Sequence, residues 1–178
     1  LLQHPDYERG VYTMPNMTTL ESVNCYAAAF DFLAKRYCTP DNRYGRIAHW
    51  IMHNEVDGCI DWTNMGIKPL TVFTDTYIKS MRICYNIVRQ YDKQAEVLGS
   101  FTHSWTQIAN VGWWLYTSKE IIDLLNVYSR VEGDFQWGLA YHSSSQDLTN
   151  PCVWIDPNAT FSMDTKFITF KNLEVLSK

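Results

Sequence analysis

The chain has 178 residues, of which 46% are apolar and 19% charged, a composition typical of one globular domain and not of a disordered or fibrous chain. Fifteen Lys and Arg against nineteen Asp and Glu give a net charge of −4 without any basic run, which argues against nucleic acid as a partner. No apolar stretch approaches the roughly 18 residues needed to cross a bilayer, so we expect no membrane-spanning segment.

The two ends and the cysteines bear on what kind of chain this is. It begins at Leu1 and not at methionine, and residues 170–178 look like a helix that stops in mid-pattern, so we expect a piece of a longer protein. The five cysteines form neither CxxC pairs nor a zinc-ligand spacing, which predicts free thiols, most of them buried. They leave the compartment open, a secreted or extracytoplasmic location included.

The first half of the chain alternates between strand and helix patterns. A short strand is predicted over residues 10–15, and the apolar spacing over 20–37 is that of an amphipathic helix. A compact apolar run follows at 47–52, short enough for a strand. It leads directly into the polar residues 53–55, so this strand is expected to carry functional side chains at its tip.

The second half repeats the alternation. Pro69 is placed to open a helix whose apolar face continues to residue 88, and a short strand is predicted over 96–101. A capping box at 117–120 precedes the next helix, and a strand follows at 136–141. The last predicted helix begins near Thr169.

Four strands alternating with four helices predict a parallel sheet, either doubly wound or closed into a (β/α)8 barrel. Neither GxGxxG nor GxxxxGK[ST] occurs, although nucleotide-binding open sheets need such loops. Polar residues instead follow three strands at their C-terminal tips, as in barrels, where catalytic groups come from several strands. Because a barrel takes roughly 250 residues, residues 1–178 are predicted to be the central portion, about four βα units, of a parallel (β/α)8 TIM barrel truncated at both ends.

The string Trp50-Ile51-Met52-His53-Asn54-Glu55 resembles the fourth strand of the clan-A retaining glycoside hydrolases. In that clan an Asn-Glu pair supplies the acid/base carboxyl and an amide that binds the sugar's 2-hydroxyl. The likeness extends to Asp61-Trp62 and to the strand that ends in Ala140-Tyr141-His142. More narrowly, the strings FLAKRY, GRIAHWIMHNEVD, DWTNMG, WGLAYH and ITFKNLEVL are similar to a bacterial family of presumed glycosidases with an uncharacterised substrate.

The resemblance implies a glycosidase acting on a poly- or oligosaccharide, with Glu55 as general acid/base and no cofactor. A retaining enzyme needs a second carboxylate roughly 5–5.5 Å away as nucleophile, which by the resemblance lies on a strand after Lys178. Desolvation among aromatic walls would raise the pKa of Glu55 and keep it protonated. Asn54 can donate and accept hydrogen bonds to a sugar hydroxyl. The alternative is that Glu55 only caps the loop that follows it or forms a salt bridge with it.

Further side chains are candidates for sugar binding: His103, His142, Trp62 and Trp105. The histidines could bind hydroxyls or orient carboxylates, and the tryptophans could stack on a pyranose ring, but all four could also be structural. Trp113 and Trp114, after the strand at 96–101, are not ranked, and the role of His53 is open.

The last predicted strand departs from the clan's pattern. It usually continues as His-x-Tyr, with the tyrosine donating to the nucleophile, whereas Ser144 stands in that place here. A non-catalytic carbohydrate-binding barrel therefore stays an alternative. A metal-dependent TIM-barrel hydrolase that uses Glu55, His103 and His142 is a weaker one, because neither HxH nor HExxH occurs and no metal site is predicted.

Overall fold

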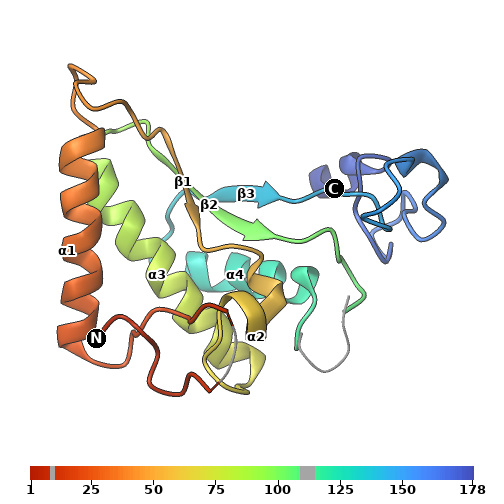
Figure 1. Ribbon diagram of the computed structural model, residues 1–178, viewed down its shortest axis with the longest axis horizontal. Helices are drawn as coiled ribbons and strands as arrows, with labels where there is room; N and C mark the ends of the chain where they lie inside the picture. Colours follow the sequence, from red (N-terminus) through yellow and green to blue (C-terminus); the bar gives the residue numbers. More distant parts are fainter. Residues whose placement is uncertain (9–10, 109–114) are drawn as a thin grey trace.

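The computed structural model describes residues 1–8, 11–108 and 115–178, which form a small parallel sheet with helices packed against it (Figure 1). In chain order the elements are α1 (Leu20–Tyr37), β1 (His49–Met52), the 3₁₀ helix η1 (Val56–Gly58), α2 (Cys59–Trp62), α3 (Leu70–Tyr91), β2 (Glu96–Phe101), α4 (Ser118–Val131), β3 (Gly138–Tyr141), and the 3₁₀ helices η2 (Val153–Ile155) and η3 (Leu173–Ser177).

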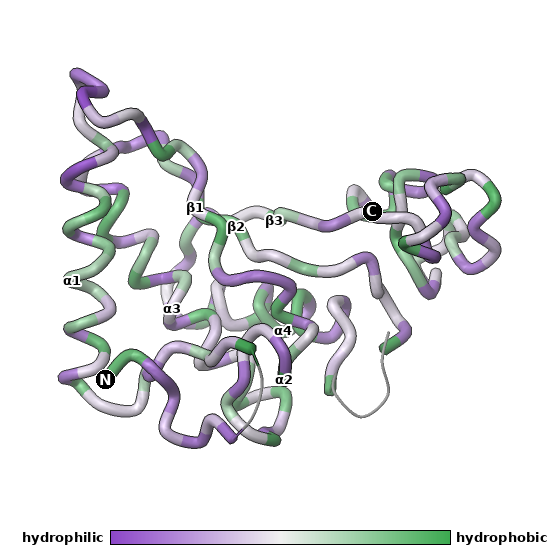
Figure 2. Tube along the Cα trace, viewed as in Figure 1, coloured by the Kyte–Doolittle hydropathy of each residue, from purple (hydrophilic) through white to green (hydrophobic). Residues whose placement is uncertain are grey.

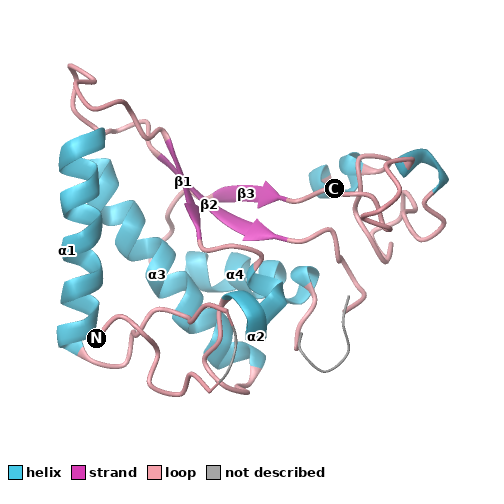
Figure 3. Ribbon diagram, in the orientation of Figure 1, coloured by secondary structure: helices cyan, strands magenta, loops and turns pink. Residues whose placement is uncertain are grey.

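Within the described residues the sheet has three strands in the order β1-β2-β3, and both pairs are parallel (Figure 3). Trp50 lies opposite Val97, and Gly99 lies opposite Leu139 in the next pair. The strands predicted at 47–52, 96–101 and 136–141 are thus present, adjacent and in sequence order. Their C-terminal ends meet at one edge of the sheet.

The predicted TIM barrel is wrong. The described residues form an open sheet with β1 and β3 as its edges, not a portion with four βα units. Most of the predicted strand at 10–15 is described, and it makes only isolated bridges, from Thr13 to Asn64 and from Pro15 to Gln3; Gly10 lies outside the described residues. Alternating strand and helix patterns predict parallel βα pairs, but closure depends on strand number, tilt and stagger, which no single unit encodes.

Helices α1, α3 and α4 form one layer on the sheet, with α3 packed between α1 and α4 and against β1 and β2. Exposure alternates along β1, where Trp50 and Met52 are buried while His49 and Ile51 are exposed. The apolar core between the layers includes Trp50, Met52, Val97 and Phe101 from the strands and Phe73, Tyr77 and Met81 from α3. Figure 2 shows the hydrophobic residues that recur along α3, β1 and β2.

The helix boundaries follow local sequence signals. The capping box before α4 is confirmed, because Thr117 Oγ1 accepts from the Glu120 N–H at 3.2 Å and Glu120 Oε2 accepts from the Thr117 N–H at 2.9 Å. Helix α3 begins directly after Pro69, as predicted. The helix expected from Thr169 is instead the short 3₁₀ helix η3. There the Asn172 side chain accepts from the Thr169 N–H at 2.8 Å, a local bond that favours a turn over a helix.

The C-terminal segment, residues 142–178, consists of loops and short 3₁₀ helices (blue in Figure 1). Its Ile168 and Val175 form a small second core with Trp105. All five cysteines are free, and Cys38, Cys59 and Cys84 are buried, which confirms the prediction for these three. Over the described residues, no helix combines the length and apolarity that a membrane span requires.

Candidate active site

The loop that leaves β1 has an unusual backbone. His53 and Glu55 both have positive φ, 61° and 42°, a left-handed conformation that residues other than glycine seldom adopt. The end of β1 is fixed in place, because the buried Tyr77 hydroxyl on α3 donates to the Met52 carbonyl at 2.9 Å. Strained backbone of this kind persists only where the surroundings hold it, and it is common at functional sites.

Glu55 faces the ends of the two neighbouring strands. Its Oε1 lies 2.8 Å from His142 Nδ1, after β3, while its backbone N–H donates to Ser100 Oγ, on β2, at 3.0 Å. Ser100 Oγ is in turn 3.4 Å from His142 Nε2. The three residues therefore form a closed ring of hydrogen bonds across the sheet edge, which joins side chains 87 positions apart in the chain.

One proton arrangement satisfies all three bonds of the ring. In it Ser100 Oγ accepts from the Glu55 N–H and the Ser100 hydroxyl donates to His142 Nε2, which acts as acceptor. The proton of a neutral imidazole then sits on Nδ1 and is donated to Glu55 Oε1. The second carboxylate oxygen, Oε2, makes no hydrogen bond within the described residues. The Glu55 side chain keeps 26% of its surface exposed, so a ligand can reach it.

The order serine, histidine, carboxylate is also that of a hydrolytic triad. Ser100 has no exposed surface, however, and one lone pair of its Oγ is taken by the Glu55 N–H. A nucleophile must be reached by its substrate. Ser100 therefore positions His142 and Glu55, and nucleophilic attack by its hydroxyl is excluded by burial.

Asp57, two residues beyond Glu55, has no exposed surface. Its Oδ1 accepts from the Thr102 N–H at 2.9 Å and its Oδ2 accepts from the Thr102 hydroxyl. Burial raises the pKa of Asp57 to about 6, and the bonds to Thr102 oppose that rise. The carboxyl ties the loop after β1 to the end of β2. No pattern in the sequence distinguished it from other loop aspartates.

His53 lies half-buried against α1 and α3. Its Nε2 is 3.3 Å from Ser80 Oγ and 3.5 Å from the Tyr26 hydroxyl. Desolvation lowers the pKa of His53 to about 4, so its imidazole is neutral near pH 7. The sequence left the role of His53 open. In the structure its imidazole is within hydrogen-bonding distance of one hydroxyl on α1, from Tyr26, and one on α3, from Ser80.

A pocket of about 340 Å³ opens beside the same loop, lined by Tyr12, Thr13, His53, Asn54 and Trp62. The rings of Tyr12 and Trp62 are nearly parallel, with centroids 5.6 Å apart and an interplanar angle of 18°. Two of the predicted sugar-binding residues, Asn54 and Trp62, thus share one pocket. Tyr12 was missed because it lay within the predicted strand at 10–15.

The other predicted binding residues lie elsewhere. Trp105 is only 4% exposed and donates to the Met163 carbonyl at 2.9 Å, so neither ring face is open for stacking. His103 is half-buried, with its ring 5.4 Å from that of Phe167, and burial lowers its pKa. Ser144, in the place of the expected tyrosine, donates its backbone N–H to the His142 carbonyl at 2.8 Å. Trp113 and Trp114 lie outside the described residues.

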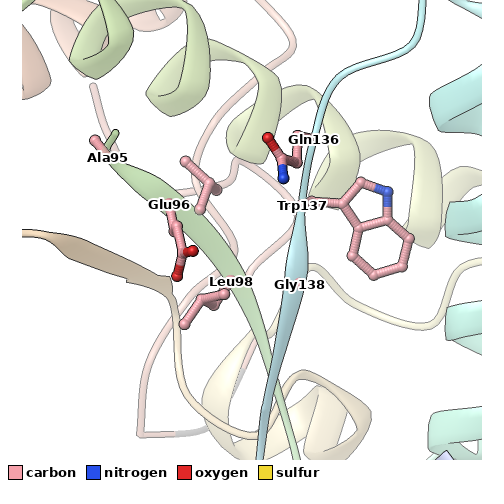
Figure 4. A pocket seen from close by; sticks show the side chains of 7 residues that line it. Ala95, Glu96, Leu98, Gln136, Trp137 and Gly138 are labelled. Atoms are coloured by element: carbon pink, nitrogen blue, oxygen red, sulfur yellow. The ribbon is translucent and has the colours of Figure 1, made fainter. Parts of the chain in front are cut away.

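Two further features bear on other functions. The described residues contain no group of three or more His, Cys, Asp or Glu side chains placed to hold a metal ion. A small pocket of about 110 Å³ lies at the opposite, N-terminal end of β2 and β3, between Glu96, Leu98 and Trp137 (Figure 4). It contains none of the candidate residues.

The chain belongs to a family of unknown function, DUF5722, whose model matches residues 1–178. No curated protein and no solved structure shows significant similarity to it.

Proposed function

We propose that the protein is a retaining glycoside hydrolase in which Glu55 is the general acid/base for cleavage of O-glycosidic bonds in a poly- or oligosaccharide. The observation that carries the proposal is the ring of Glu55, His142 and Ser100 at the C-terminal edge of the sheet. It holds a partly exposed carboxyl in one orientation beside a pocket with aromatic walls.

The ring leaves a defined atom for proton transfer. Glu55 Oε1 is engaged by His142 Nδ1, so the proton that the acid delivers to the leaving oxygen is carried on Oε2. After the bond breaks, the same carboxylate accepts a proton from the attacking water, as microscopic reversibility requires of a retaining enzyme. The left-handed backbone at Glu55 and its N–H bond to Ser100 keep the carboxyl in place in both steps.

Asn54 is the residue proposed to bind a sugar hydroxyl. Its side chain is exposed, and its amide makes no hydrogen bond within the described residues, so its donor and acceptor are both available. Asp57 does not supply the second carboxyl that a retaining mechanism needs, because it is fully buried and both its oxygens are bonded to Thr102. This proposal thus assigns the acid/base role to Glu55 and leaves the nucleophile to another residue.

The test is Glu55→Gln, assayed on aryl glycosides and on unactivated oligosaccharides. General acid/base catalysis contributes about 10²–10⁴-fold, so turnover of unactivated substrates should fall by that factor. Cleavage of glycosides with good leaving groups should suffer less, because those groups need little protonation.

Glu96→Gln is a matched control. Glu96 also pairs with a histidine, at 2.8 Å from His49 Nδ1, but at the opposite end of the sheet. The Glu96→Gln variant should therefore turn over substrate at the rate of the parent protein. Equal turnover by Glu55→Gln and the parent protein on an unactivated glycoside would remove Glu55 from the acid role. Binding of oligosaccharides without any hydrolysis by the parent protein would favour the non-catalytic alternative.

A further inference from the structure

We propose that the pocket formed by Tyr12, Trp62, Asn54 and His53 is a subsite for one neutral pyranose ring of the substrate. This inference rests on the proposed function and adds to it a residue set and a ligand class. Asn54 and Glu55 are consecutive, and the first lines the pocket while the second faces His142. A sugar in the pocket therefore lies directly beside the loop that carries the acid/base.

Backbone hydrogen bonds fix the position of the aromatic wall formed by Tyr12 and Trp62. The Tyr12 N–H donates to the Asp61 carbonyl at 2.9 Å, and the Asn64 N–H donates to the Tyr12 carbonyl at 3.1 Å. These bonds hold the N-terminal segment along α2, beside which it runs in Figure 1, and bring the Tyr12 ring against Trp62. Tyr12 nevertheless keeps 59% of its surface exposed. An aromatic ring that is both fixed and exposed can pack against the C–H face of a sugar with little loss of side-chain entropy.

The polar wall offers donors and acceptors without charge. The Ser80 hydroxyl donates to the Tyr77 carbonyl at 2.6 Å, so Ser80 Oγ can accept from His53 Nε2–H at 3.3 Å. His53 Nδ1 then keeps a free lone pair, and it makes no hydrogen bond within the described residues. Together with the Asn54 amide, it can bind two hydroxyl groups of one ring.

The composition of the pocket selects a neutral ligand. None of its five lining residues carries a formal charge, since burial keeps His53 neutral by lowering its pKa to about 4. A uronic acid or a phosphate would find no counter-charge there. The volume of about 340 Å³ is small for a ligand site, because such pockets typically enclose about 300–1,000 Å³. A pocket of this size has room for a sugar ring.

The experiment uses Glu55→Gln as the background, so that bound sugar is not consumed. The variant is titrated by calorimetry with neutral hexasaccharides of glucose, xylose, mannose and galactose, and with an oligogalacturonate as the acidic probe. At least one neutral probe should bind, more tightly than the acidic one. Adding Tyr12→Ala or Trp62→Ala should weaken that binding about tenfold, which corresponds to 1.4 kcal/mol of binding free energy.

Two further variants guard against misfolding and non-specific effects. Trp62→Phe keeps a ring and should retain most of the affinity, with a loss of about threefold. Trp154→Ala removes another exposed tryptophan, in the C-terminal segment, and should change nothing. Absence of binding by every neutral probe, preference for the acidic probe, or affinities unchanged by both Tyr12→Ala and Trp62→Ala would overturn the subsite. These outcomes are separate from the turnover of Glu55→Gln, which tests the proposed function.

Discussion

The layer of helices and the C-terminal edge of the sheet are built on different principles. Between the helices and the sheet, large apolar side chains such as Phe73, Tyr77 and Phe101 are fully or almost fully buried. At the C-terminal edge, polar side chains from three strand ends bond to one another, and two residues have left-handed backbone. Burial of apolar side chains in the first region stabilises the fold. In the second region the strained backbone lowers stability, but it fixes the orientation of Glu55.

The largest loss of stability is expected when a buried side chain between the helices and the sheet is removed. Phe101→Ala removes a fully buried ring that packs edge-on against Tyr77, with centroids 6.4 Å apart. The lost burial and the remaining cavity should lower the free energy of unfolding by about 3–5 kcal/mol, measured by urea denaturation. Ile51→Thr is the control on the other face of the sheet, where Ile51 is 54% exposed, and it should change that free energy by about 0.5 kcal/mol or less. A similar loss of unfolding free energy in Phe101→Ala and Ile51→Thr would mean that both faces of the sheet are equally buried.

The next effect concerns Asp57 and is a dependence on pH. The carboxyl titrates near 6 when folded and near 3.8 when unfolded, so the folded protein binds the extra proton between those values. The contribution of Asp57 to stability is therefore greatest below pH 4 and declines as the pH rises to about 6, by about 3 kcal/mol in all. Asp57→Asn should gain stability relative to the parent protein over that range. The unfolding free energies of Asp57→Asn and of the parent protein are measured by urea denaturation at several pH values. A difference between them that stays constant from pH 4 to 7 would contradict this prediction.

The contribution of His53 to stability should depend on pH in the opposite direction to that of Asp57. Its pKa falls from 6.5 to about 4 on folding, so the unfolded chain binds the extra proton between those values. Stability from this residue rises with pH from about 4 to 6.5, again by about 3 kcal/mol. His53→Asn, which tolerates the positive φ, should lose stability relative to the parent protein over the same range. The parent protein itself should change little there, since the two slopes nearly cancel.

The smallest effect returns to the helix layer and to a purely local contact. Thr117→Ala removes one half of the capping box of α4, which should cost about 1 kcal/mol of unfolding free energy. Thr117→Ser keeps the hydroxyl and should restore most of the loss. An equal loss in both variants would show that the methyl group, and not the hydrogen bond, is responsible.

Local patterns predicted three of the strands and three of the helices because the causes of these elements are local, whereas the strand expected at 10–15 and the helix expected from Thr169 do not form. The 3.6-residue apolar spacing identified α1 and α3, the Thr117–Glu120 capping box marked the start of α4, and three apolar runs gave the strands. Each of these signals acts over a few residues, through side-chain spacing or a single backbone bond. The sequence also identified Asn54 and Glu55 as neighbours at the tip of a strand.

The tertiary structure decided the rest. Whether the sheet closes depends on the mutual tilt and stagger of strands, so the barrel expected from the alternation was not determined by it. The pairing of Glu55 with His142 crosses 87 positions, and the roles of Ser100 and Asp57 arise from their burial beside other strands. Likewise, Tyr12 reaches Trp62 only because the N-terminal segment bonds to α2 and the residues after it. A polar residue acquires its partner when distant segments pack together, and no short-range pattern records which segments these will be.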